Sequence, residues 1–167
     1  HLEESGSGVL DEYVDSTGNG HDGQGGAGTQ YLTPNTASGV LGGGQSFEDQ
    51  TFEYISLPRE ALDGLADSTV SWWHQTSRDT DASILSGANS TFTNEYWLRW
   101  LNSNDDLYTY NSNSGNNSEP ANGLIYNDGS WQHHVAVADS STNERFLYSN
   151  GLASVNNPRT GVTIDPL

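Results

Sequence analysis

The chain has 167 residues, of which 22 are acidic and five are Arg, with no Lys, so its formal net charge is −17. This charge excludes nucleic acid and anionic membrane surfaces as electrostatic partners and favours Ca²⁺ or cationic surfaces, or else serves only to keep the protein hydrated. The absence of Cys excludes disulfides, thiolate metal sites and cysteine nucleophiles. No apolar run approaches the roughly 20 residues that span a bilayer, so we expect no membrane insertion.

The length predicts a single domain over residues 1–167, because a chain of this size buries about 70% of the surface that its unfolded form exposes. The chain begins at His1, and its first residues are not typical of a secretory signal. We therefore expect a fragment of a larger protein.

The first predicted element is a tight turn over residues 15–23, where Gly, Asn and Asp are dense. Such composition is typical of Asx and Gly turns. It is also compatible with a calcium loop in which Asp15 and Asn19 would be ligands. The loop is not an EF-hand, because Thr17 and Gly26 occupy two of its ligand positions. A turn without metal is favoured, and the calcium site stays the alternative.

The middle of the chain predicts short strands with turns between them. We expect a flexible glycine turn over 39–44, an alternating strand over 52–58 and one helical turn over 60–65. Residues 68–76 predict an interior strand, because Trp72 and Trp73 place large side chains on both faces. Further strands are expected over 83–86, 96–101 and 107–110, with polar loops over 87–95 and 111–122.

The strongest strand signal is residues 131–138, followed by 144–151. The two-residue strand period places alternate residues on opposite faces, and neither face is strongly charged, so we predict a central strand covered on both sides. The pair Asn150-Gly151 predicts a type I′ hairpin turn. His133 and His134 point to opposite faces, which favours core histidines over ligands of one metal ion. Together these elements predict an all-β fold, an antiparallel β-sandwich or jelly roll.

Five segments in order carry a resemblance to a known family: residues 15–23, 45–47, 69–73, 129–137 and 147–151. They resemble the laminin-G-like, concanavalin A-like jelly rolls over nearly the whole chain. The resemblance implies one laminin-G-like β-sandwich, here without the family's last strands. It also implies an extracellular or cell-surface location in bacteria, as in a pilus-biogenesis protein of the mannose-sensitive haemagglutinin type.

Residues 83–86 and 93–100 further resemble the pentraxin branch of these folds, in which an Asp-Asn-Glu motif supplies calcium ligands. Asn94 matches that motif and is the implied ligand, whereas Thr93 departs from it and removes one carboxylate. The other ligands of that branch lie on a segment that would follow Leu167. The implied calcium site is therefore weaker or differently built.

No catalytic residues are predicted. A retaining glucanase of the same architecture needs two carboxylates about 5–5.5 Å apart, typically as Glu-x-Asp-x-x-Glu on one strand, and the sequence lacks this motif. Its five Trp favour core packing, although at most one ring of the pair Trp72 and Trp73, and one of the pair Trp97 and Trp100, can face outward and stack on a sugar.

We therefore predict a non-catalytic extracellular module for recognition or adhesion. Its partners would be a glycan or a protein surface and the neighbouring domains of a larger chain, with calcium as an organiser and no other cofactor. Two alternatives stay open. One is a structural spacer domain in a pilus or envelope assembly, and the other is a module related to glycoside hydrolases.

Overall fold

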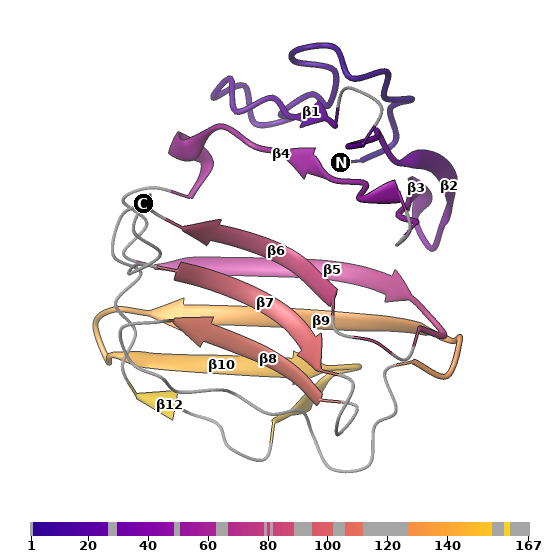
Figure 1. Cartoon of the computed structure of the whole chain (residues 1–167). Coiled ribbons are helices and arrows are strands. Elements are labelled where there is room, and N and C mark those ends of the chain that lie inside the picture. Colours follow the sequence, from indigo (N-terminus) through magenta and orange to yellow (C-terminus); the bar gives the residue numbers. More distant parts are fainter. Residues whose placement is uncertain are drawn as a thin grey trace. The chain divides into compact units, whose positions relative to one another are not determined.

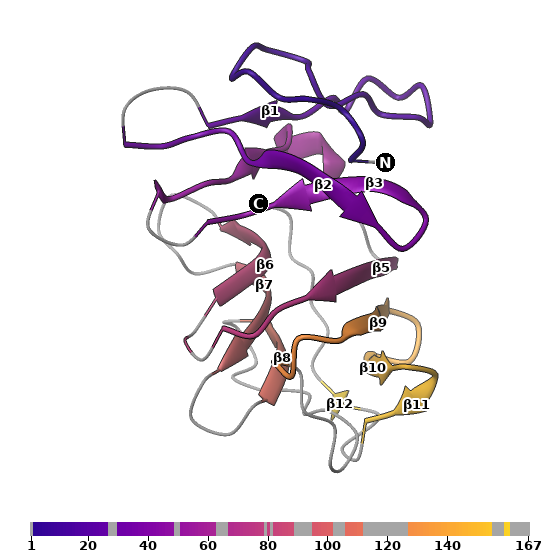
Figure 2. The same cartoon turned by 90° about the vertical axis from the view of Figure 1, so that its right-hand side faces the viewer.

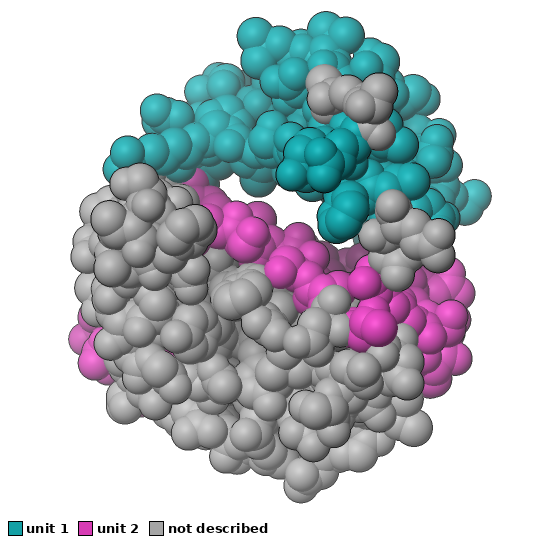
Figure 3. All heavy atoms as spheres, in the orientation of Figure 1, with its two compact units in different colours: residues 1–61 teal, residues 62–167 magenta. Residues whose placement is uncertain are grey.

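The computed structural model describes residues 2–26, 30–48, 51–62, 67–78, 80, 82–88, 95–101, 106–111, 127–154 and 159–160. The chain divides into two compact units, residues 1–61 and 62–167, which Figure 3 colours separately. The single domain over 1–167 stays a prediction. Among the described residues, no helix is long and apolar enough to cross a bilayer.

Unit 1 contains two antiparallel strand pairs. Strand β1 (Gln24–Gly25) pairs with β4 (Ile55–Ser56), and β2 (Asn35–Gly39) forms a hairpin with β3 (Gly42–Ser46). Tyr13 is buried and is joined to Gly23 by two backbone hydrogen bonds of 3.0 and 2.7 Å. These two bonds close the loop that carries the predicted Asx turn.

Three predictions for unit 1 differ in extent from the structure. The glycine turn predicted over 39–44 is confirmed but shorter: Val40 and Leu41 form the turn, Gly39 pairs with Gly42 beside it, and the remaining glycines lie inside β3. Backbone pairing needs no side chain, so glycines are compatible with this hairpin. The strand expected over 52–58 is limited to β4. The helical turn is a short 3₁₀ helix, η2 (Arg59–Ala61), and residues 63–65 of the predicted turn lie outside the described residues.

Unit 2 contains two antiparallel sheets (Figures 1 and 2). In the first, the order is β11 (Leu152–Ala153), β10 (Glu144–Ser149), β9 (Trp131–Asp139) and β5 (Ser68–Gln75), and β12 (Arg159–Thr160) also pairs with β10. The second contains β6 (Ala82–Ala88), β7 (Glu95–Leu101) and β8 (Asp106–Asn111) in that order. The predicted strands over 68–76, 83–86, 96–101 and 107–110 are thus confirmed.

The two sheets pack face to face through apolar side chains. Ala136 of β9 and Leu147 of β10 form the buried centre, and Ile84 and Leu85 of β6 pack against them from the second sheet. The predicted all-β fold, an antiparallel β-sandwich, is confirmed.

Strand β9 buries one of its two faces. Its even-numbered residues from Gln132 to Ala138 are buried, whereas its odd-numbered residues are half-buried or exposed. The position between β5 and β10 confirms the predicted central strand, but the cover predicted for both faces is wrong, since Trp131 is 39% exposed.

The interior position predicted for residues 68–76 is also wrong. Strand β5 is the last strand in the described order of its sheet, and its Trp73 is 42% exposed. Of its two Trp rings, Trp72 packs against the core cluster, whereas Trp73 points to the opposite face and packs on the imidazole of His133.

The hairpin from β10 to β11 confirms the turn prediction. Asn150 and Gly151 have φ angles of 49° and 79°, and Ser149 pairs with Leu152 across them. Two successive positive φ angles are those of a type I′ turn.

Candidate functional site

Asp15 closes the predicted turn in unit 1. Its Oδ1 accepts hydrogen bonds from the backbone N–H and the hydroxyl of Thr17 at 2.8 and 2.6 Å, and its Oδ2 accepts from the N–H of His21 at 3.2 Å. The hydroxyl bond from Thr17, with the two backbone bonds, lowers the pKa of Asp15 to about 2. Asp15 is therefore ionised at neutral pH and supports the loop as an Asx turn does.

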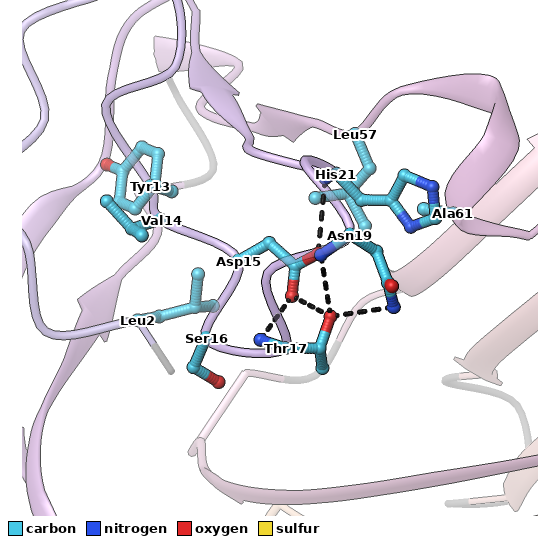
Figure 4. Close-up of a pocket in the computed structure, with 10 residues that line it drawn as sticks. All are labelled: Leu2, Tyr13, Val14, Asp15, Ser16, Thr17, Asn19, His21, Leu57 and Ala61. Atoms are coloured by element: carbon cyan, nitrogen blue, oxygen red, sulfur yellow. Dashed lines mark hydrogen bonds between the residues drawn. The ribbon is translucent and has the colours of Figure 1, made fainter.

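A pocket of about 400 Å³ lies beside this turn (Figure 4). It combines polar side chains of the turn with apolar side chains of the same unit, and its lining consists of Leu2, Tyr13, Val14, Asp15, Ser16, Thr17, Asn19, His21, Leu57 and Ala61. The structure thus places two predicted calcium ligands, Asp15 and Asn19, at one pocket. The third, Asn94, lies outside the described residues.

The described residues contain no group of three or more His, Asp or Glu side chains that could hold a metal ion. The amide of Asn19 donates to the Thr17 hydroxyl at 2.9 Å, so this side chain takes part in the turn itself. Calcium at Asp15 and Asn19 stays a prediction.

Glu12 is a strongly held carboxylate that the sequence did not single out. It accepts backbone N–H bonds from Ser7, Gly8 and Val9 and from Gly25 of β1, the last at 2.8 Å. Burial alone would raise its pKa, but these four donors together outweigh burial and lower the pKa of Glu12 to about 2. A local clue is the Ser- and Gly-rich segment before it. The hydrogen bond from the Gly25 N–H could not be expected from the local sequence, because folding brings Gly25 to Glu12.

His134 lies on the buried face of the first sheet of unit 2. It is fully buried, its Nδ1 lies 2.9 Å from the hydroxyl of Ser149, and its ring stacks between Trp72 and His74. Burial, followed by the charges of His74 and His133, lowers the pKa of His134 to about 3, so the imidazole is neutral at physiological pH. The prediction of a core histidine is confirmed for this residue.

His133 points to the opposite face, as the strand period predicted. Its Nε2 lies 2.9 Å from the hydroxyl of Ser71, and its ring centroid lies 4.8 Å from that of Trp73. Gln75 is paired in register with Trp131 on the same side of the sheet. We call the part of this surface around the two Trp rings the outer face; it consists of Ser71, Trp73, Gln75, Trp131, His133 and Val135.

The outer face has the chemistry of a binding surface. It presents two partly exposed indole rings on paired strands, next to a hydroxyl, an imidazole and an amide group. Ligand sites in proteins typically combine such apolar rings with a few polar groups that orient the ligand. Trp97 and Trp100 have side chains outside the described part of the chain.

A solved structure and a family model are similar to this chain. Domains LG4-5 of the mouse laminin alpha1 chain are similar in structure, with 14% sequence identity and a TM-score of 0.46 over 60% of this chain. That match spans 25% of the laminin chain. No curated protein matches the chain. The family model for laminin G domains described as the concanavalin A-like lectin/glucanases superfamily matches residues 48–166, more than two thirds of the sequence. The chain therefore belongs to the concanavalin A-like lectin/glucanases superfamily.

Proposed function

We propose that this chain is a non-catalytic recognition or adhesion module that binds a glycan or a protein surface outside a bacterial cell. The observation that carries the proposal is the outer face, where Trp73 and Trp131 stay partly exposed on strands of a packed sandwich. Exposed aromatic rings on a rigid element bind partners at low entropic cost and are enriched at the centres of binding surfaces.

The test is a glycan array probed with and without calcium, followed by competition with free sugar. We expect saturable binding that free sugar removes. A parallel screen against protein surfaces covers the other partner class. The absence of saturable binding in both screens would contradict the proposal.

Catalysis is the alternative that the family name raises, because the superfamily includes glucanases. A glycosidase needs a carboxylic acid whose pKa is raised, so that it can donate a proton to the leaving group. Glu12 and Asp15 are the described carboxylates whose pKa is lowered to about 2. Both accept hydrogen bonds from backbone N–H groups. These properties support a non-catalytic role. Turnover of a polysaccharide that one carboxylate substitution abolishes would overturn it.

Calcium is proposed as an organiser of this module. If Ca²⁺ binds the folded chain, the midpoint of thermal unfolding rises with free Ca²⁺ and falls on chelation. Loss of the increase in Asp15→Asn assigns the ion to the turn, whereas loss in Asn94→Ala assigns it to the pentraxin-like position. Glu60→Gln, which removes an exposed charge, is the control. An equal midpoint with Ca²⁺ and with chelator would refute a calcium role.

The spacer hypothesis has one observation in its favour. Unit 1 exposes several large apolar side chains, among them Leu10, Leu41 and Phe52, and such surfaces often mark contacts with other proteins. Oxidative footprinting of these residues in the assembled parent protein tests it. Protection in the assembly but not in the isolated chain supports packing against neighbouring domains of a pilus or envelope, and equal labelling contradicts it.

A further inference from the structure

We propose that the outer face binds a neutral glycan chain, with one pyranose ring stacked on the exposed side of Trp73. This inference rests on the proposed recognition function and names its site and its ligand class. It is carried by how the Trp73 ring is held, by the position of a second indole beside it, and by the charge of the chain.

The Trp73 ring packs against His133, which lies opposite it on the paired strand and is itself contacted by Ser71. The imidazole of His133 lies against it with an interplanar angle of 33°, and the Ser71 hydroxyl contacts that imidazole at 2.9 Å. His133 therefore covers part of the indole while the ring as a whole stays 42% exposed. A ring held before the ligand arrives loses little freedom on binding, which favours affinity.

Trp131 extends the aromatic surface beyond one sugar unit. In the strand register, Trp73 pairs with His133 and Gln75 pairs with Trp131, so the two Trp residues are diagonal neighbours on one face. Diagonal neighbours on paired strands lie roughly 7–8 Å apart, within reach of aromatic side chains. A surface of two adjacent indoles fits an oligosaccharide better than a single monosaccharide.

Polar groups border the two rings. The Gln75 side chain is oriented by the hydrogen bond from its Nε2 to the carbonyl oxygen of Gly129 at 2.8 Å, and its amide oxygen can accept from a sugar hydroxyl. The Ser71 hydroxyl and the His133 ring lie beside Trp73 on the same face. A pyranose has the complementary surface, with C–H groups on its faces and hydroxyl groups around its edge.

Charge selects a neutral ligand. None of the six side chains of the outer face is a carboxylate, Lys or Arg, and the chain as a whole carries a net charge of −17. A sulfated or uronate-rich glycan would be repelled by that charge and would find no guanidinium on this face to pair with. A neutral glycan incurs neither cost.

The experiment is calorimetric titration of the whole chain with neutral probes, the hexaoses of cellulose, mannan and xylan, and with anionic probes, alginate and heparin oligosaccharides. We expect binding of at least one neutral probe, and Trp73→Ala should weaken its Kd about tenfold or more. Trp131→Ala should weaken it less, and Trp73→Phe should retain part of the affinity. The control is Phe47→Ala, which removes an exposed aromatic ring of unit 1 and should leave the Kd unchanged.

His133 acts in this proposal as a positioning residue. His133→Ala should weaken binding, and His133→Phe should restore most of the affinity because it again places a ring against Trp73. Far-ultraviolet circular dichroism verifies that both variants are folded. Equal losses in the two folded variants would show that ring packing does not position the site.

The outcomes separate the inference from the proposed function. If a neutral glycan binds and Trp73→Ala and Trp131→Ala keep full affinity, the site is wrong and recognition stands. If only anionic glycans or a protein bind, the ligand class is wrong. If neither glycans nor proteins bind, the proposed function itself fails.

Discussion

Replacement of Glu12 by Gln isolates one carboxylate that organises unit 1. Glu12 accepts backbone N–H bonds from a local segment, residues 7–9, and from Gly25 in β1. Glu12→Gln keeps the shape of the side chain but removes its charge and replaces one acceptor oxygen with an N–H₂ group. That group faces N–H donors, so at least one backbone donor loses its acceptor.

The magnitude follows from the pKa of Glu12, which is lowered from 4.5 to about 2. This difference corresponds to about 3 kcal/mol of stability at neutral pH, and solvent screening of a half-buried carboxylate reduces it to about 2 kcal/mol. The folded pKa lies below the unfolded one, so the contribution is complete above about pH 4.5. It is lost as the pH falls toward 2.

The assay is hydrogen exchange by NMR at the amides of Ser7, Gly8, Val9 and Gly25, expressed as protection factors. Tryptophan fluorescence does not report on this unit, because all five Trp lie at or beyond position 72. We expect Glu12→Gln to lower protection roughly 30-fold at pH 7, and Glu60→Gln, at an exposed position, to lower it little. Unchanged protection in Glu12→Gln, or wild-type protection that is constant from pH 6 to 2, would refute the reasoning.

Three further predictions concern unit 2. The free energy of unfolding should fall as the pH is lowered from about 6.5 toward 3, because His134 binds a proton in the unfolded chain but not when it is buried. The double variant His134→Phe with Ser149→Ala should reduce this pH dependence, as measured by urea unfolding with Trp fluorescence as the signal. Leu147→Ala should cost about 2–5 kcal/mol in the same assay, because the side chain is fully buried between the sheets, and a loss below about 1 kcal/mol would contradict this core. Gly151→Ala should cost about 1–2 kcal/mol, since its φ of 79° is left-handed. Asn150→Gly is the matched variant: it tolerates the positive φ but loses the hydrogen bond that its side chain accepts from the His133 N–H, so it should cost about 1 kcal/mol or less by thermal unfolding.

The β10–β11 hairpin was predictable because its determinants are local. Asn and Gly are the residue types that most readily adopt positive φ angles, and both do so here at Asn150 and Gly151. The separation of His133 from His134 was equally predictable, because it depends only on the strand period.

Exposure could not be predicted in the same way. Two large rings at Trp72 and Trp73 indicated an interior strand, yet only Trp72 packs with the core cluster. Sequence alternation identifies the two faces of a strand but not which of them a second layer covers. The role of Glu12 could not be predicted for a related reason. One of its hydrogen-bond donors, Gly25, lies 13 residues away in the sequence and is brought near by folding.

The alternation along β9 also determines how freely this protein can evolve. Its even-numbered residues are buried, so a change there disturbs the packing of the sandwich. Its odd-numbered residues, such as Trp131 and His133, lie on the outer face and can be exchanged with little effect on that packing. A single strand can therefore acquire new ligands by substitution at every second position while the interior, and with it the fold, is retained.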